Sequence, residues 1–185
     1  RRYEWIMTLE PDIQIVSMTS SPDGQTDILL TGDDPMQTLP QPKEDLPAGR
    51  DPSKPVPVGQ PMLLVRILQR ENDPSRGEAK PRIDVVRDDK PKSQVAPVRR
   101  LVIPSESVEP KYKVLLIPHR KGDDLPVTTW DDAGTRVTLQ FPKTAGGGKD
   151  EIAFQKSESG KTHIQVRRGD KVLASVNKEP PQPLE

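Results

Sequence analysis

Short runs of alternating apolar and polar residues recur along this chain, separated by Pro, Gly and Asp. Successive side chains of an extended strand point to opposite faces, so such runs predict β-strands. No run has the apolar spacing of a convincing helix. The predicted strands are residues 3–8, 12–18, 26–31, 62–68, 82–86, 98–103, 111–118, 127–130, 136–141, 150–155, 162–167 and 171–176. We therefore expect an all-β protein, an antiparallel β-sandwich of stacked sheets with about twelve strands.

The run at 111–118 has the strongest strand pattern. Tyr112, Val114 and Leu116 fall on one face, while Lys113, Leu115 and Ile117 fall on the other. Because only the first half of the second face is polar, the pattern predicts a core strand that enters a layer covered on both sides. We expect the other strands to be its neighbours.

Turn residues predict how neighbouring strands connect. The first three strands are expected to form a β-meander, with Ser21-Pro22-Asp23-Gly24 as the turn before the third. The last two strands are expected to form a hairpin around Arg168-Gly169-Asp170. That tripeptide also occurs in cell-adhesion motifs, but a β-turn explains it without a receptor.

A Pro-rich excursion interrupts the strands between residues 35 and 61. It contains eight prolines in 27 residues, too many for a helix or a strand ladder. We interpret it as an insertion between paired strands within a single β-sandwich domain spanning residues 1–178, followed by a tail at 179–185. The alternative is a linker between two domains.

The composition of the chain disfavours several classes of partner and site. The 28 Lys and Arg residues balance the 28 Asp and Glu residues, which disfavours a nucleic-acid or membrane partner for the whole molecule. No window approaches the roughly 18 apolar residues of a membrane helix. The absence of Cys excludes disulfides and thiolate metal sites. The chain starts at Arg1 without an initiator Met, so we expect it to be part of a larger protein.

A basic cluster around the 111–118 strand is the candidate binding site. Residues 99–121 hold six Lys or Arg against Glu106 and Glu109, a local net charge of +4. Such a cluster can bind a carboxylated or sulfated polymer through charge-assisted hydrogen bonds. It requires that the strand carrying residues 99 and 100 lie beside the 111–118 strand. The candidate substrate-binding residues are Arg99, Arg100, His119, Arg120 and Lys121.

Other chemistry-bearing residues favour structural roles. His119 and His163 have no partners at metal-ligand spacing, so we predict no metal and no cofactor. Adjacent aspartates at 33–34, 88–89, 123–124 and 131–132 point to opposite sides of an extended chain and fit solvated turns. Gly146-Gly147-Gly148-Lys149 lacks the strand, helix and Gly-Lys-Ser/Thr ending of a phosphate loop. No strand-turn-helix elbow presents a nucleophilic Ser.

Three stretches resemble a known family. Arg2-Tyr3-Glu4-Trp5-Ile6-Met7-Thr8 is similar to a strand in the β-domain of heparinase II/III-like polysaccharide lyases. Residues 61–68, Pro-Met-Leu-Leu-Val-Arg-Ile-Leu, and residues 112–120, Tyr-Lys-Val-Leu-Leu-Ile-Pro-His-Arg, resemble two later strands of that domain. The similarity follows the order of nearly the whole chain.

The resemblance implies a multi-domain enzyme in which a helical toroid packs against an antiparallel β-sandwich. Such lyases cut uronic-acid-containing polysaccharide by β-elimination: a base removes the proton α to the carboxylate while another group stabilises the enolate. The catalytic Tyr and its His partners of the family lie upstream, and the His expected late in the first strand is Thr8 here. No catalytic residue is therefore assigned to this chain.

The resemblance further implies an acidic polysaccharide and the helical toroid domain of the same parent chain as partners, with no nucleic acid and no membrane. It implies a secreted or periplasmic bacterial protein, inactive without its helical part. A non-catalytic carbohydrate-binding or structural β-sandwich module is the alternative function.

Overall fold

A computed structural model describes residues 2–10, 12–21, 25–32, 54–73, 75, 80–86, 98–156 and 161–178. These residues form an all-β antiparallel protein of twelve strands in three sheets, consistent with the expected β-sandwich. They contain no α-helix, and Lys143–Ala145 form a 3₁₀ turn. The chain divides into two compact units, Arg1–Gly122 (unit 1) and Asp123–Glu185 (unit 2). The single domain expected over residues 1–178 stays a prediction.

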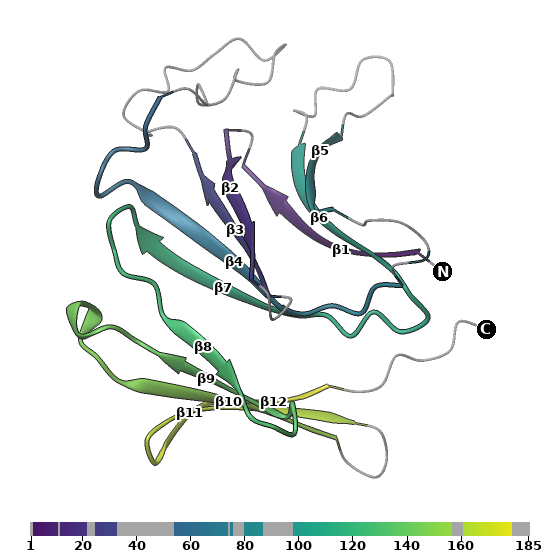
Figure 1. The fold of residues 1–185 in the computed structure, drawn as a ribbon, viewed down its shortest axis with the longest axis vertical. Coiled ribbons are helices and arrows are strands. Elements are labelled where there is room, and N and C mark those ends of the chain that lie inside the picture. Colours follow the sequence, from purple (N-terminus) through teal and green to yellow (C-terminus); the bar gives the residue numbers. More distant parts are fainter. Residues whose placement is uncertain are drawn as a thin grey trace. The chain divides into compact units, whose positions relative to one another are not determined.

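Unit 1 contains two sheets (Figure 1). The first has the order β1-β6-β5 and the second has the order β2-β3-β4-β7, all antiparallel. In the first sheet the strands are β1 (Arg2–Leu9), β5 (Arg82–Val86) and β6 (Val98–Glu106). In the second they are β2 (Gln14–Ser20), β3 (Thr26–Thr31), β4 (Pro61–Gln69) and β7 (Lys113–Arg120).

The core of unit 1 forms where the apolar faces of these two sheets meet. Alternation along β1 leaves Trp5 and Met7 half-buried on the inner face, while Glu4 and Ile6 remain exposed. The seven buried side chains of the cluster come from both sheets: Leu9, Ile28, Leu30, Val65, Ile67, Leu101 and Ile103. Burial of this apolar surface is the main force that holds the two sheets together.

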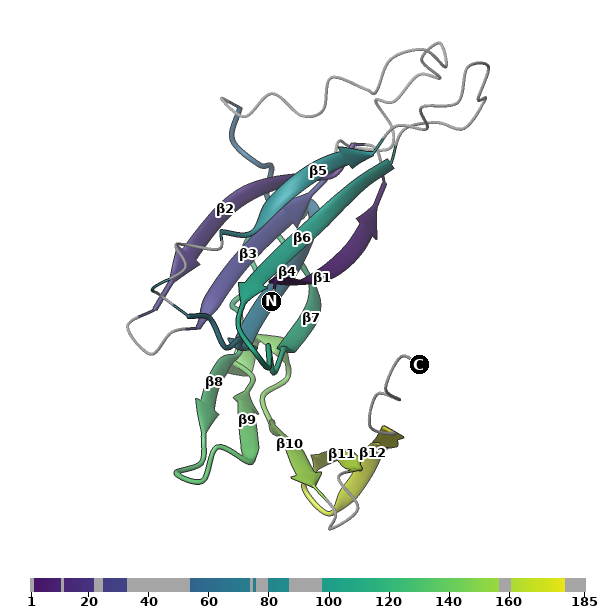
Figure 2. The same cartoon turned by 90° about the vertical axis from the view of Figure 1, so that its right-hand side faces the viewer.

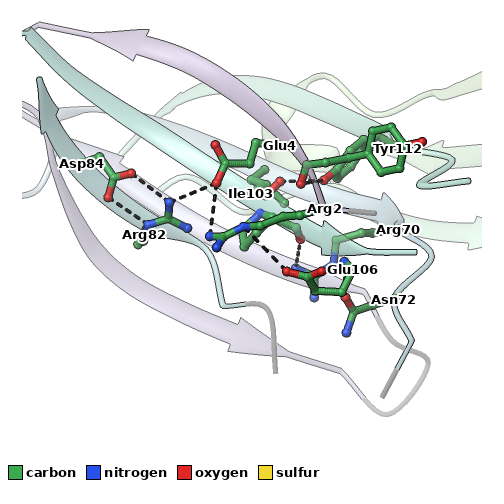
Figure 3. Close-up of polar contacts among 11 residues, drawn as sticks. Arg2, Glu4, Arg70, Asn72, Arg82, Asp84, Ile103, Glu106 and Tyr112 are labelled. Carbon is green, nitrogen blue, oxygen red and sulfur yellow. Dashed lines mark hydrogen bonds and ion pairs between the residues drawn. The ribbon is translucent and has the colours of Figure 1, made fainter. Parts of the chain in front are cut away.

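Hydrogen bonds from polar side chains connect the two sheets at one end of this sandwich (Figure 3). The segment after β4 is tied to β6, because Arg70 donates to the Pro104 carbonyl at 3.0 Å and Asn72 Oδ1 accepts from the Glu106 N–H at 2.9 Å. The Tyr112 hydroxyl reaches the Ile103 carbonyl at 2.8 Å. Side chains of the segments after β4 and before β7 therefore satisfy backbone groups of the first sheet.

The 111–118 strand is not the central core strand that its pattern predicted. β7 lies at the edge of its sheet and pairs only with β4, and Leu116 is 48% exposed. β4 takes the central role instead, because it lies between β3 and β7 and both its faces are buried. Leu64 on one face and Val65 on the other are fully buried.

The expected meander of the first three strands is also only partly right. β2 and β3 pair as predicted, but β1 pairs with β6 in the other sheet, where Arg2 lies opposite Glu106. The turn predicted at residues 22–24 lies outside the described residues, as do residues 35–53 of the Pro-rich excursion and the tail at 179–185. Residues 54–61 are described and lead into β4.

Unit 2 is a five-stranded antiparallel meander in the order β12-β11-β10-β9-β8 (Figures 1 and 2). Its strands are β8 (Val127–Trp130), β9 (Arg136–Gln140), β10 (Lys149–Lys156), β11 (Thr162–Arg168) and β12 (Lys171–Lys178). Alternation places Val137, Leu139 and Ile152 on one face, where they are buried, and mainly polar residues on the other. The hairpin predicted around Arg168-Gly169-Asp170 is confirmed, with Gly169 at φ 56° in the turn.

Candidate functional site

The basic end of β7 is anchored to the segment that precedes β4. Arg120 lies opposite Pro61, and its guanidinium donates to the Gly59 carbonyl at 2.9 Å. The Lys121 backbone continues the pairing, since its N–H donates to the Gln60 carbonyl at 2.9 Å and its carbonyl accepts from the Gly59 N–H at 2.8 Å. The backbone at this end is therefore fixed, while the side chains of Arg120 and Lys121 are exposed.

His119 is half-buried and points away from Arg120, because neighbouring residues of a strand face opposite sides. Its Nδ1–H donates to the Arg120 carbonyl at 3.0 Å, since a carbonyl oxygen can only accept. Nε2 is buried and has no hydrogen-bond partner in the described part of the chain. His119 therefore offers no accessible acceptor to a ligand, and it belongs to no group of three or more metal-ligating residues among the described ones.

Arg99 and Arg100 lie on β6 and face opposite sides of the first sheet. Arg99 points inward, and its Nη1 donates to the Ile13 carbonyl at 3.2 Å, which ties β6 to the start of β2. Its Nε atom is buried without a partner among the described residues. Arg100 lies on the outer face, between Thr8 of β1 and Asp84 of β5.

The structure does not bring these five residues together on one surface. β6 lies between β1 and β5 in the first sheet, whereas β7 pairs with β4 in the second, so the condition for one basic cluster is not met. Arg100 and His119 occupy the outer faces of the two opposed sheets, and Arg99 has a structural contact. Substrate binding by these residues stays a prediction, and the exposed pair Arg120 and Lys121 is its best remaining part.

A charge network that the sequence did not reveal covers the outer face of the first sheet (Figure 3). Arg82 of β5 contacts Asp84 at 2.9 Å and, across the sheet, Glu4 of β1 at 3.2 Å. Arg2 contacts Glu4 at 3.2 Å and Glu106 at 3.7 Å. The hydrogen bonds that Arg82 donates to Asp84, and then to Glu4, raise its pKa above the ordinary value.

This network spans all three strands but has nearly balanced charge. Two guanidiniums serve three carboxylates, and Arg100 on the same face supplies the third cation. The cations are therefore compensated within the sheet, which favours a role in holding β1, β6 and β5 together over the capture of an anion.

The remaining polar residues with possible chemistry make local contacts. His163 Nδ1 lies 2.7 Å from Asn177 Oδ1 across β11 and β12. Asp131 accepts the N–H groups of Arg136 and Thr135, which lower the pKa of its carboxyl and close the turn before β9. Arg168 of the Arg-Gly-Asp tripeptide makes two hydrogen bonds to Asp150, at 2.7 and 2.9 Å. Its guanidinium is therefore engaged within the protein.

Of the other Asp pairs, 33–34 and 88–89 lie outside the described residues. Gly146, Gly147 and Gly148 all have positive φ angles and form a tight connection between β9 and β10. No group of three or more His, Asp or Glu residues capable of holding a metal is found in the described ranges. These ranges also contain no helix long and apolar enough to span a membrane.

Comparisons with known proteins identify no relative. No protein-family model matches the chain, and no curated protein or solved structure matches it significantly.

Proposed function

We propose that this chain is the C-terminal β-sandwich part of a heparinase II/III-like polysaccharide lyase that cleaves uronic-acid-containing polysaccharide by β-elimination. The catalytic base and its partners come from a helical toroid domain of the same parent chain. The β-sandwich supports that domain and contributes contacts to the acidic polymer. The proposal places the enzyme outside the cytoplasm, secreted or in a bacterial periplasm.

One observation carries the proposal: the three stretches that resemble the family each form a strand of the same unit. Residues 2–8 lie in β1, residues 61–68 in β4 and residues 112–120 end in β7. β4 and β7 are paired side by side, with Leu64 opposite Ile117. The three stretches therefore contribute strands to one β-sandwich unit, which supports the proposal.

Two residues of this chain support placing the catalytic groups in another domain. Thr8 occupies the position where the family strand has a His, and a Thr hydroxyl cannot serve as a general base near neutral pH. Tyr112 has a hydroxyl engaged with the Ile103 and Tyr3 carbonyls, and burial raises its pKa. A half-buried phenol whose hydroxyl is already engaged is a poor candidate for proton transfer to substrate.

The test is the absorbance of unsaturated uronate produced from a panel of acidic polysaccharides. The parent protein should produce it, and this chain alone should not. The lyase proposal fails if the parent protein produces none from any polymer of the panel.

A non-catalytic carbohydrate-binding or structural module is the second candidate. It requires only exposed cations such as Arg120 and Lys121 and no catalytic residue. The upstream part of the parent gene discriminates the two functions. Helical toroid patterning there supports the lyase, whereas another β-sandwich or a membrane anchor supports the module.

A further inference from the structure

The polar face of the unit 2 sheet gathers cations that are far apart in the sequence. Residues directly opposite each other in neighbouring strands share a face. Glu151 of β10 lies between Thr138 of β9 and Arg167 of β11. One step along β10, Ala153 lies opposite Arg136, and Lys149 lies two residues before Glu151. Three cations from three adjacent strands therefore surround one carboxylate.

Only one of the three cations is paired with that carboxylate. Lys149 Nζ lies 2.8 Å from Glu151 Oε1. Its hydrogen bond and charge hold the pKa of Glu151 below the ordinary value, and the Arg136 and Arg167 guanidiniums add to the effect. Within the described residues, neither guanidinium forms an ion pair of its own. Both are exposed.

A second carboxylate, that of Asp131, lies near Arg136 but does not form an ion pair with its guanidinium. Asp131 lies at the turn before β9, and both of its oxygens already accept hydrogen bonds. Oδ1 accepts the N–H groups of Thr135 and Arg136 at 2.8 and 2.9 Å, and Oδ2 accepts the Thr135 hydroxyl at 3.0 Å. The Arg136 and Arg167 guanidiniums thus keep donors available to an external anion.

The surroundings of these cations favour a sugar polymer. Strand registers place Gln140 beside Lys149 and Gln165 beside Ala153, so amide groups flank the cations on the same face. The aromatic pair Trp130 and Phe154 belongs to the opposite face, where Trp130 lies opposite the buried Val137. Single-stranded nucleic acid is bound largely by stacking on aromatic rings, and the described strands present no Phe, Tyr or Trp on this polar face.

The spacing fits a polymer better than a single small anion. Neighbouring strands are about 4.8 Å apart, and alternate residues along a strand are about 6.8 Å apart. Arg136 and Arg167 lie two strands apart and are offset by two residues along the strand direction. Their backbones are therefore about 12 Å apart. An extended chain with repeated acidic groups can reach both guanidiniums.

We propose that this face, defined by Arg136, Lys149, Glu151 and Arg167, binds the carboxylate or sulfate groups of an acidic polysaccharide. Arg136 and Arg167 make the main contacts through charge-assisted hydrogen bonds, and Lys149 contributes when it exchanges Glu151 for the polymer. The site consists of unit 2 residues alone, whereas Arg120 and Lys121 belong to unit 1. It does not rest on the lyase proposal, because a non-catalytic module would carry it equally.

The test is affinity for polygalacturonate and for heparin, with neutral dextran and single-stranded DNA as comparison polymers, measured with the full chain at low salt. R136Q/R167Q should weaken binding to the acidic polysaccharides about tenfold. K156Q/K171Q, which removes the same charge from exposed positions on the opposite face of the same sheet, is the matched control and should bind nearly as the wild type does. E151Q should bind more tightly, because the competing carboxylate is gone.

Equal loss in R136Q/R167Q and K156Q/K171Q would overturn the proposal, since it would indicate that net charge alone sets the affinity. Unchanged binding in R136Q/R167Q, weaker binding in E151Q, or DNA binding as tight as that of the polysaccharides would also overturn it. Unfolding curves of each variant show that the fold is kept. Because the assay measures binding and not cleavage, its failure is distinct from failure of the lyase proposal.

Discussion

Replacing Asp27 by Ala should destabilise unit 1 strongly, because it removes a carboxylate that forms a bidentate pair with a buried cation. Arg66 lies in the central strand β4 with its side chain only 7% exposed, and Asp27 lies opposite in β3 at 21%. The two side chains form a bidentate pair with distances of 2.8 and 2.7 Å. The attraction within such a pair offsets the cost of desolvating both charges. Removing the Asp27 carboxylate alone leaves the desolvation cost of Arg66 without that attraction.

The magnitude follows from the burial. Breaking a fully buried ion pair costs about 3–5 kcal/mol, and the partial exposure of Asp27 lets water replace some of the lost interaction, so we expect about 2–4 kcal/mol for Asp27→Ala. Replacing both partners by apolar residues, Asp27→Leu with Arg66→Met, removes the charges together. That double variant should lie within about 1 kcal/mol of the wild type.

The assay is urea unfolding followed by Trp fluorescence in a Trp130→Phe background. The chain has two Trp residues, Trp5 in β1 and Trp130 in β8, so this background leaves a reporter in unit 1 alone. The linear extrapolation gives the free energy of unfolding of each variant. A loss below about 1 kcal/mol in Asp27→Ala would show that solvent screens the pair. A double variant as unstable as the single variant would show that packing, not charge, carries the effect.

Three further changes test other parts of the fold. Tyr112→Phe should cost about 1 kcal/mol of stability, because its hydrogen bonds are lost. Burial raises the pKa of Tyr112, so the stability of the wild type should fall as pH rises above about 10, and that of the variant should fall less. Urea unfolding at two pH values measures both effects. Asp131→Ala should reduce amide-exchange protection at Arg136. Because the pKa of Asp131 is lowered, this protection in the wild type should be lost as pH falls through that pKa. Asp131→Asn should remove this pH dependence. Gly122→Ala should destabilise by more than about 1 kcal/mol in thermal unfolding, because φ is +100° and the new Cβ would lie 3.3 Å from Val58 Cγ1.

Local pattern was sufficient to locate the strands. The predicted runs 26–31 and 82–86 coincide with β3 and β5, because turn residues bound them and their side chains alternate between faces. Sheet membership was harder, since it depends on pairing between distant segments. β1 pairs with β6, about a hundred residues later, and no local signal in residues 3–8 specifies that partner. The same limit explains why β4, not β7, is the central strand.

Candidate sites were harder to predict for the same reason. Arg99 and Arg120 are close in sequence, but their strands enter different sheets, so proximity along the chain did not become proximity in space. Arg136, Lys149 and Arg167 are far apart in sequence and meet because the meander aligns their strands. Predicting that meeting requires the hairpin registers, which the turn residues between these strands only partly define.

The most direct test of an acidic-polysaccharide role is an NMR titration of the ¹⁵N-labelled chain with an oligogalacturonate. We predict shifts of backbone amides on the polar face of unit 2, centred on Glu151, Ala153 and Gln165, with smaller shifts near Lys121. Shifts confined to other strands, or a spectrum that does not change at saturating oligosaccharide, would contradict the account.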